Sequence, residues 1–281
     1  MWKLFANLLA CACLAACSPL GALSSASPDE HRRALTGIAY GEETRQRLDV
    51  YLPEPATADA PTVVFFYGGG WRNGDRGKYA FVASSLTALG YVVVIPDYRV
   101  YPEVRFPAFV EDAAAAVAWA AEHAHNHGSS PDQVFLAGHS AGAHLAALLA
   151  LDPSYLDAHG IDADALPGWI GLSGPYDFLP LSGYLADVFP KDTRPASQPV
   201  NFAHSGAPPA LLIHGADDGT VEPRNSRSLA AALEAAGVPV TLRIYEDAGH
   251  ARTVAALAPP LDFLAESLQD IERFIDAQRP R

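Results

Sequence analysis

Residues 134–142 read Val-Phe-Leu-Ala-Gly-His-Ser-Ala-Gly, and they decide how the rest of the sequence is interpreted. The apolar residues 134–137 predict a buried strand, and the apolar run that starts at His144 predicts a helix directly after it. Between the two, residues 138–142 fit the pattern G-x-S-x-G, in which a sharp strand-to-helix turn lifts a serine above the sheet. The pattern predicts a nucleophile at Ser140; the alternative is a serine that only caps a helix.

Strand and helix patterns alternate on both sides of this turn. Apolar, β-branched runs predict strands at residues 48–52, 62–67, 91–95, 133–137, 169–172, 210–214 and 240–245. Apolar or alanine-rich stretches predict helices near residues 76–89, 107–127, 140–151, 225–236 and 261–277. The alternation predicts an α/β fold with a mostly parallel, doubly wound sheet and helices on both faces.

A single folded domain is expected, because no repeat is present and no linker divides residues 36–279. The stretch from 151 to 208 is rich in Pro, Gly, Asp and Ser, so we expect loops there, at the mouth of the fold. Of the 281 residues, 49% are hydrophobic and 18% are charged, which excludes disorder as the dominant state. The formal net charge of −13 disfavours nucleic acid as a partner.

A serine hydroxyl is a weak nucleophile, so Ser140 needs a histidine base and an orienting carboxylate. In folds with this serine turn, the chain order is Ser, then Asp or Glu, then His. His250 is the only histidine after residue 214, and it follows the predicted strand at 240–245. Asp217 and Asp218 both follow the strand at 210–214. Acid and base therefore fall just past strand carboxyl ends, where ligands bind in open α/β sheets.

Together these residues resemble an α/β-hydrolase of the carboxylesterase type, and the resemblance covers nearly all of residues 36–279. It implies that Ser140 is the nucleophile and His250 the general base. The family's segment G-x-x-D-x-x-V matches residues 215–221 in register, which implies that Asp218 is the orienting acid. Residues 97–109 resemble the feruloyl, acetyl and isoprenylcysteine esterase relatives within this family.

Residues 65–71, Phe-Phe-Tyr-Gly-Gly-Gly-Trp, resemble the oxyanion-hole sequence H-G-G-G-[FW] of lipases and esterases. The resemblance implies that the main-chain N–H groups of Gly69, Gly70 and Ala141 stabilise a developing oxyanion. The alternative for the three glycines is a flexible turn. Tyr67 stands where the family usually has His, and we expect its hydroxyl to anchor the loop.

Several residues outside these motifs have expected roles. Asp97 and Arg99 are expected to brace loops rather than touch substrate. Five apolar side chains are expected to line an acyl or alcohol pocket, with packing in a lid as the alternative: Trp71, Phe178, Leu179, Tyr184 and Phe189. The spacing of His123, His125 and His127 allows a metal site, but we expect them to end a helix with Gly128 as its stop, and we expect no metal.

The N-terminal region has the pattern of a targeting segment. One Lys and a short apolar run predict a signal peptide over residues 1–16, too short for a spanning helix. The sequence Leu-Ala-Ala-Cys at 14–17 resembles a bacterial lipobox, which implies a lipid on Cys17, a tether over residues 17–35 and a catalytic domain over residues 36–281. Ser18 favours the outer membrane of the cell envelope. The alternative is an ordinary signal peptide and a secreted protein.

The sequence therefore predicts a lipid-anchored serine carboxylesterase that acts on a small-molecule ester. We expect no cofactor, because no G-x-G-x-x-G or P-loop motif is present. Two alternatives stay open: amide hydrolysis by the same triad, as in a peptidase or formamidase, and a binding lipoprotein built on an inactive hydrolase fold. No motif indicates the natural ester or the oligomeric state.

Overall fold

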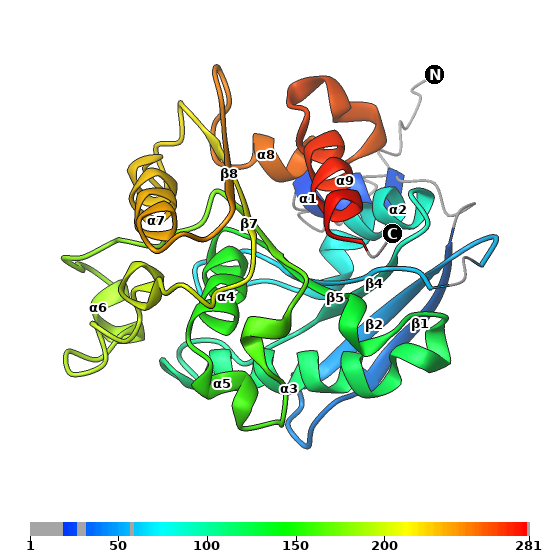
Figure 1. Ribbon diagram of the computed structural model, residues 1–281, viewed down its shortest axis with the longest axis horizontal. Coiled ribbons are helices and arrows are strands. Elements are labelled where there is room, and N and C mark those ends of the chain that lie inside the picture. The colour runs from blue at the N-terminus through cyan, green and yellow to red at the C-terminus, as the bar shows by residue number, and fades with distance from the viewer. Residues whose placement is uncertain (1–18, 27–31, 57–58, 280–281) are drawn as a thin grey trace, which may run out of the picture.

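Eight strands form one sheet with the order β1-β2-β4-β3-β5-β6-β7-β8 (Figure 1). The computed structural model describes residues 19–26, 32–56 and 59–279. The strands are β1 (Arg32–Ala39), β2 (Arg47–Pro53), β3 (Thr62–Phe66), β4 (Val92–Pro96), β5 (Val134–His139), β6 (Trp169–Leu172), β7 (Ala210–Gly215) and β8 (Val240–Tyr245).

The strand directions confirm the prediction of a mostly parallel sheet. Strand β2 is antiparallel to both β1 and β4, and from β4 across to β8 all neighbouring strands are parallel. Parallel strands place their carboxyl ends at one edge of the sheet. The loops that follow β5, β7 and β8 therefore meet there, and they carry Ser140, Asp218 and His250.

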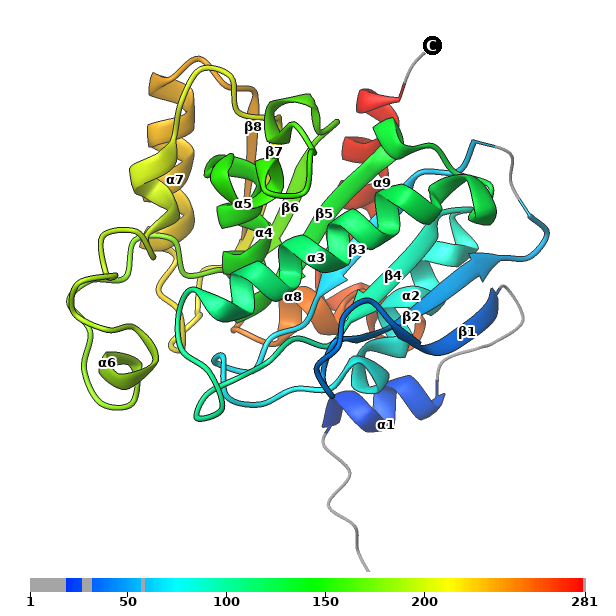
Figure 2. The same ribbon diagram turned by 90° about the horizontal axis from the view of Figure 1, so that it is seen from below.

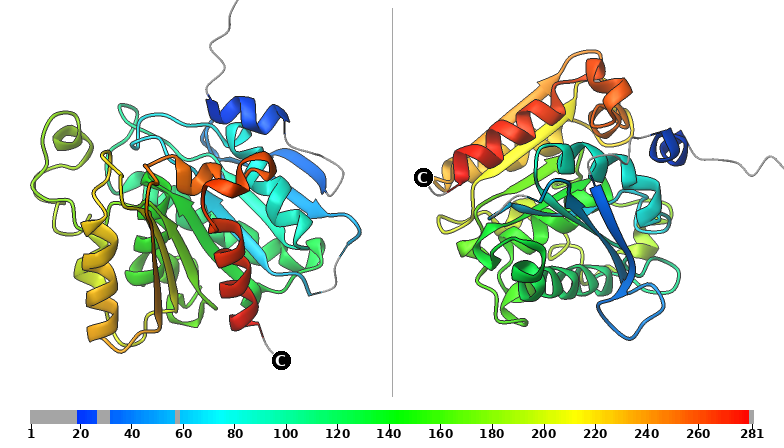
Figure 3. Two further views of the ribbon diagram at one scale, coloured as in Figure 1. Left: turned by 90° about the horizontal axis from the view of Figure 1, so that it is seen from above. Right: turned by 90° about the vertical axis from the view of Figure 1, so that its right-hand side faces the viewer.

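Helices cover both faces of the sheet, as predicted. Helices α2 (Ala80–Ala88) and α9 (Ser267–Gln278) lie on one face, and α3 (Ala108–His123) and α4 (Ala141–Leu151) lie on the other (Figure 3). The other α-helices are α1 (Pro19–Ala26), α5 (Ser154–Asp157), α6 (Leu185–Val188), α7 (Arg224–Ala235) and α8 (Arg252–Ala255). Short 3₁₀ helices are η1 (Arg76–Tyr79), η2 (Ala124–His127), η3 (Pro131–Gln133), η4 (Ala163–Ala165), η5 (Pro199–Phe202) and η6 (Pro259–Leu264).

Helix α4 is buried along its whole length, because small side chains let it lie close to the strands. A Cβ atom at Gly142 would lie 2.0 Å from the carbonyl oxygen of Phe66 at the end of β3, so only glycine allows this approach. Alanine and leucine make up most of α4, which contacts both the sheet and α3. This packing fixes the first turn of α4, which begins directly after Ser140.

The N-terminal part of the fold differs from the prediction. Within the predicted tether at 17–35, the described residues include α1, which packs beside η1 and α2, and the start of β1 at Arg32, so these parts of the range are folded elements. Strand β1 lacks a continuous apolar run, and a bulge between Leu35 and Ile38, where Gly37 has φ 71°, interrupts its alternation. The signal peptide and Cys17 lie outside the described residues.

The segment from 151 to 208 consists mainly of loops and short helices, as predicted. It contains β6 and the single-turn helices α5 and α6, and α6 lies beyond the end of the sheet (Figure 2). The predicted helix at 261–277 is divided into η6 and α9, with α9 beginning at Ser267. Within the described ranges, no helix combines the length and the apolar character needed to cross a bilayer.

Candidate active site

Ser140 lies in a sharp turn between β5 and α4. Its backbone has φ 55° and ψ −122°, a conformation that L-residues rarely adopt. A Cβ atom at Gly138 would lie 2.3 Å from the carbonyl oxygen of Gly142, and the Ser140 N–H donates to the Leu172 carbonyl oxygen at 2.8 Å. The two glycines of the G-x-S-x-G pattern are thus required by the close backbone contacts of the turn.

His250 and Asp218 meet Ser140 at this edge of the sheet. His250 Nε2 lies 2.8 Å from Ser140 Oγ, and His250 Nδ1 lies 2.7 Å from Asp218 Oδ2. An ionised carboxylate can only accept, so His250 Nδ1 carries the ring proton and Nε2 accepts a hydrogen bond from the serine hydroxyl. The structure therefore brings together the three residues that the sequence predicts as a triad.

Asp217, the alternative acid, is exposed, and its backbone N–H donates to the Ala248 carbonyl oxygen at 3.0 Å. The side chain of Asp218 is fully buried. Its Oδ1 accepts from the backbone N–H groups of Thr220 and Val221, both at 2.9 Å. The neighbouring Asp217 therefore has the wrong position in the turn to reach the histidine.

Asp218 is held as an anion. Burial alone would raise its pKa, but hydrogen bonds from His214, His250 and the Val221 N–H outweigh burial and hold the pKa well below its usual range. A carboxylate that stays ionised is the partner that His250 needs to keep its proton on Nδ1.

His214 is a residue of the site that sequence reasoning did not identify. Its Nε2 lies 2.9 Å from the Val221 carbonyl oxygen and 3.2 Å from Asp218 Oδ2, so Nε2 carries the ring proton. Its Nδ1 lies 2.7 Å from Ser226 Oγ, which donates to it. The side chain is fully buried, so this arrangement holds the carboxylate oxygen that also contacts His250.

His139, the residue directly before Ser140 in the G-x-S-x-G pattern, holds the catalytic base His250 in position. Its Nε2 lies 3.1 Å from the His250 carbonyl oxygen, and the two rings have centroids 4.9 Å apart. Burial first, and then the nearby charge of His250, lower the pKa of His139 to about 3. His139 therefore stays neutral and fixes the backbone of His250 without competing for its proton.

Residues 67–74, here called the glycine loop, pack against the serine turn. A Cβ atom at Gly68 would lie 3.0 Å from Ser140 Cβ. Gly69 and Gly70 have φ 147° and 61°, and among the described residues no acceptor binds their N–H groups. Ala141 is the first residue of α4, and its N–H belongs to the unpaired first turn. These are the three donors that the sequence predicts for an oxyanion.

The expected anchor through the Tyr67 hydroxyl is confirmed. Arg45 Nη2 donates to Tyr67 Oη at 2.8 Å. The Tyr67 ring is fully buried and stacks against Tyr98 and Tyr79, with ring centroids 4.7 and 5.8 Å apart. The Gly68 N–H donates to Tyr79 Oη at 3.3 Å. A tyrosine therefore replaces the usual histidine within an aromatic stack.

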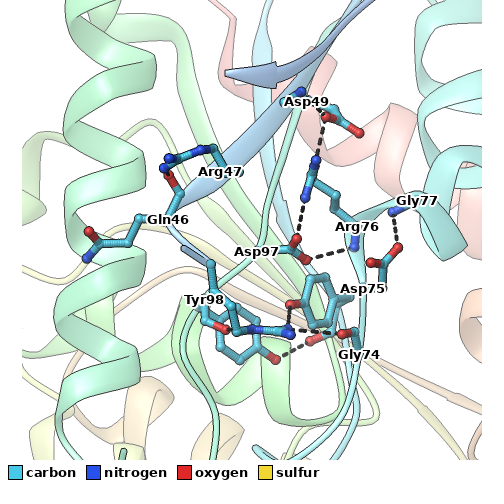
Figure 4. A network of polar contacts seen from close by, with 12 residues as sticks. Gln46, Arg47, Asp49, Gly74, Asp75, Arg76, Gly77, Asp97 and Tyr98 are labelled. Atoms are coloured by element: carbon cyan, nitrogen blue, oxygen red, sulfur yellow. Dashed lines mark hydrogen bonds and ion pairs between the residues drawn. The ribbon is translucent and has the colours of Figure 1, made fainter. Parts of the chain in front are cut away.

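Asp97 and Arg99 brace loops, as predicted, and neither lines the cavity described below. Asp97 accepts from the backbone N–H of Arg76 at 2.9 Å and forms an ion pair with its guanidinium, which also contacts Asp49 at 2.8 Å (Figure 4). Arg99 Nη2 binds the buried Asp112 in α3 at 2.7 Å. These pairs tie the loops after β3 and β4 to β2 and α3.

A cavity of about 940 Å³ opens over Ser140 and His250. It is lined by the glycine loop, by residues 175–185 and by the turn before α7. Charged side chains in its lining are Arg72, Lys78, Glu222 and Arg224. A space of this size accommodates a small organic ester.

Three of the five predicted pocket residues, Trp71, Phe178 and Tyr184, line this cavity, and the prediction is wrong for two. Phe189 is fully buried, with its ring edge-on to Trp71 at 4.8 Å and to Phe178 at 5.4 Å, so it supports the wall from behind. Leu179 is 36% exposed and is absent from the lining. An irregular loop has no periodicity that would indicate which side chains face inward.

His144, on α4, is a further residue that the sequence motifs did not single out. Trp71 Nε1 donates to its Nδ1 at 3.3 Å, and its Nε2 lies 2.8 Å from the Ser197 carbonyl oxygen. Burial lowers the pKa of His144 to about 4, so the ring is neutral and fixes the cavity wall.

The three histidines at 123–127 end α3 and η2, and Gly128 follows with φ 75°, as predicted. The His123 ring stacks on Trp119 at 4.1 Å, and His127 lies edge-on to the same ring. Among the described residues, no group of three or more His, Cys, Asp and Glu side chains is arranged to hold a metal ion.

A serine, an acid and a histidine that follow strands β5, β7 and β8 in this chain order define the class of α/β-hydrolases. Residues 48–181 match the family BD-FAE. The chain belongs to the α/β-hydrolase carboxylesterase family.

Two curated relatives and one solved structure illustrate the similarity. The "Probable isoprenylcysteine alpha-carbonyl methylesterase" of Oryza sativa subsp. japonica is 29% identical over 252 residues, which are 82% of this chain and 60% of the relative. Esterase LipC of Mycobacterium tuberculosis is 34% identical over 227 residues, 73% of this chain and 55% of LipC. Esterase 2 of Thermogutta terrifontis, phosphoramylated by tabun, is 25% identical with a TM-score of 0.74, covering 89% of this chain and 96% of the other. The chain thus spans 60% or less of these curated relatives.

Proposed function

We propose that this chain hydrolyses carboxylic esters through a Ser140–His250–Asp218 triad and an acyl-enzyme intermediate. The observation that carries the proposal is the continuous contact from Ser140 Oγ through His250 to Asp218, at 2.8 and 2.7 Å, at the base of a 940 Å³ cavity. The esterase names of its relatives support ester hydrolysis over amide hydrolysis.

In this mechanism the Ser140 Oγ attacks the ester carbonyl carbon while His250 Nε2 takes the hydroxyl proton. The carbonyl oxygen becomes an oxyanion, and the N–H groups of Gly69, Gly70 and Ala141 are the donors that stabilise it. The C–O bond to the alcohol then breaks, and His250 returns the proton to the leaving oxygen. Water, activated by the same histidine, attacks the acyl-serine and releases the carboxylic acid.

Hydrolysis of p-nitrophenyl butyrate by the purified chain, compared with its Ser140→Ala variant, tests this proposal. Removal of the nucleophile should lower kcat by about 10⁴-fold or more. Ser140→Ala deletes one oxygen, so the variant should keep the thermal midpoint of the native chain within a few degrees. A fluorophosphonate should add to Ser140 in the native chain and to no residue in the variant, as read by mass spectrometry. Equal rates in both proteins would refute the triad.

We also propose that Cys17 carries a lipid that anchors the protein to a bacterial envelope membrane. The apolar run over residues 4–16 and the lipobox-like sequence at 14–17 support this proposal. Helix α1 begins at Pro19 and packs beside η1, which contributes Lys78 and Tyr79 to the cavity. A lipid on Cys17 would then hold the catalytic domain close to the membrane surface.

A further inference from the structure

One side chain from outside the glycine loop contacts both of its ends. Arg45, in the turn between β1 and β2, donates from Nη2 to the Tyr67 hydroxyl at 2.8 Å and to the Gly74 carbonyl oxygen at 3.0 Å. Its Nε donates to the Tyr98 carbonyl oxygen at 2.8 Å, and Tyr98 Oη donates to the Tyr67 carbonyl oxygen at 2.7 Å. The guanidinium thus joins the first and last residues of the loop to each other and to the end of β4.

The glycine loop has a backbone conformation that needs glycine at three positions and is unfavourable at a fourth, Trp71. Trp71 has φ 57°, and Gly69, Gly70 and Gly74 have φ between 61° and 147°. A Cβ atom at Gly74 would lie 2.2 Å from the ring of Tyr67, so the two ends of the loop are in close contact. A loop under this strain keeps its position only through contacts with its surroundings, and these contacts decide where the N–H groups point.

The hydroxyl of Tyr67 has a fixed role in this arrangement. Burial first, and then the negative charge of Asp97, raise the pKa of Tyr67 well above its usual value, so the phenol is neutral. The hydroxyl accepts a hydrogen bond from Arg45 Nη2 at 2.8 Å. Asp97 is in turn held by Arg76, as Figure 4 shows.

We propose that Arg45 is a positioning residue for the ester hydrolysis proposed above. This proposal rests on that function, because Arg45 acts by fixing the N–H groups of Gly69 and Gly70 where the oxyanion forms. Arg45 does not line the cavity, so its effect passes through Tyr67 and Gly74. The planar guanidinium reaches three acceptors in different directions, which a lysine ammonium at the end of a flexible stem does not reproduce.

The experiment compares Arg45→Met and Arg45→Lys with the matched control Arg47→Met, using p-nitrophenyl butyrate. Arg47 Nη1 donates to the carbonyl oxygens of Gly41, Glu43 and Gln46, so the control loosens the same turn without contacting the glycine loop. We expect kcat to fall about 10- to 100-fold in both Arg45 variants with KM changed by less than twofold, since misplaced oxyanion donors act on the transition state. Arg47→Met should keep the native kcat.

A trifluoromethyl ketone, which forms an oxyanion with Ser140, should bind Arg45→Met more weakly by the same factor as kcat/KM falls. An unchanged kcat in Arg45→Met, or an equal loss of kcat in Arg47→Met, would overturn the positioning role of Arg45. Neither result would contradict the proposed ester hydrolysis. A native chain without esterase activity would instead overturn the proposed function, and this proposal with it.

If Arg45→Met does not fold, Tyr67→Phe removes the hydrogen bond between Arg45 and Tyr67 by deleting a single oxygen atom. In that case, Arg45→Lys and Tyr67→Phe should each lower kcat, and the double variant should lose no more than the worse single one. Independent, multiplicative losses would show that Arg45 does not act through Tyr67.

The charges around the cavity carry a second, separate inference. The chain has a formal net charge of −13, yet the charged residues of the lining are three basic and one acidic. Arg224 pairs with Glu222 at 2.8 Å, whereas Arg72 and Lys78 have no acidic partner among the described residues. The Arg72 guanidinium lies over the Tyr184 ring, 4.6 Å from its centroid, which holds it beside the glycine loop.

We infer that Arg72 and Lys78 favour esters that carry a negative group, such as a carboxylate, away from the reacting carbonyl. This inference also rests on the proposed function and concerns only the choice of substrate. Two uncompensated cations at the mouth of a cavity raise the local concentration of anions, and the effect weakens as salt screens it.

The test uses two esters of equal chain length, mono-p-nitrophenyl adipate and p-nitrophenyl hexanoate, and reads the ratio of their kcat/KM values. In 10 mM salt we expect the ratio to favour the adipate about tenfold, and to fall toward one in 0.5 M NaCl. Arg72→Gln and Lys78→Gln should each lower the ratio several-fold. Arg227→Gln, an exposed arginine on α7 outside the lining, should leave it unchanged. If neither salt nor either substitution changes the ratio of the kcat/KM values, the inference is overturned. Hydrolysis of the hexanoate would in that case still support the proposed function.

Discussion

His214 Nε2 lies 3.2 Å from Asp218 Oδ2, the same oxygen that binds His250 Nδ1 at 2.7 Å. Two histidines therefore share one carboxylate oxygen: His214 is fully buried, and His250 faces the cavity. His214 holds the carboxylate in place, and the carboxylate keeps the ring proton of His250 on Nδ1.

His214→Leu should destabilise the folded chain by about 1.5–3 kcal/mol at pH 7, because it removes a donor to a buried anion. His214→Gln, which keeps an N–H donor, should lose less. The lowered pKa of Asp218 stabilises the fold at pH values above the ordinary pKa of an aspartate, and this stabilisation disappears as the pH falls toward the folded-state pKa. Urea unfolding at pH 7 and pH 3.5 should therefore show a smaller difference between the native chain and His214→Leu at the lower pH. A constant difference would mean that His214 acts independently of Asp218.

Asp218→Asn should lower kcat by about 10⁴-fold, and Asp217→Asn should leave kcat unchanged. An amide at 218 can present a donor to His250 and so favours the ring tautomer with the proton on Nε2, where it blocks attack by serine. Asp217 is exposed and does not reach the histidine, so it serves as the matched control. Initial rates with p-nitrophenyl butyrate distinguish the two residues, and a loss at 217 alone would reassign the acid.

Cys17→Ser should release the protein from the membrane fraction, or leave it uncleaved, with an unchanged kcat. The lipid would be attached to the thiol of the cysteine at the end of the apolar run, and several acyl chains are needed for stable anchoring. Fractionation and mass spectrometry of the mature N-terminus measure this. An unmodified Cys17, or a mature chain that begins beyond it, would instead indicate a secreted protein.

The positions of the triad could be predicted because each residue follows an apolar strand whose carboxyl end must meet the others. Strand β1 could not, since its bulge at Gly37 breaks the alternation that marks a strand. The hydrogen-bond partner of Tyr67 could not be predicted either, because Arg45 lies in a separate turn and no local sequence pattern links the two residues. Phe189 was misassigned because an aromatic residue in an irregular loop can fill the core or face a ligand, and only the packing decides.

The stability of the fold should decrease as the pH falls from about 6.5 toward 4, because two buried histidines resist protonation. Burial holds the pKa of His139 at about 3 and that of His144 at about 4, both below the ordinary 6.5. Below pH 6.5 the unfolded chain binds a proton at each site while the folded chain does not, so protons favour unfolding. Each site should contribute a slope of up to about 1.4 kcal/mol per pH unit over this range. Urea unfolding at pH 7, 6 and 5 should therefore show a smaller slope in His144→Gln, by about one bound proton, whereas the exposed His125→Gln should keep the native slope. An unchanged slope in His144→Gln would mean that the buried ring accepts a proton within the folded chain.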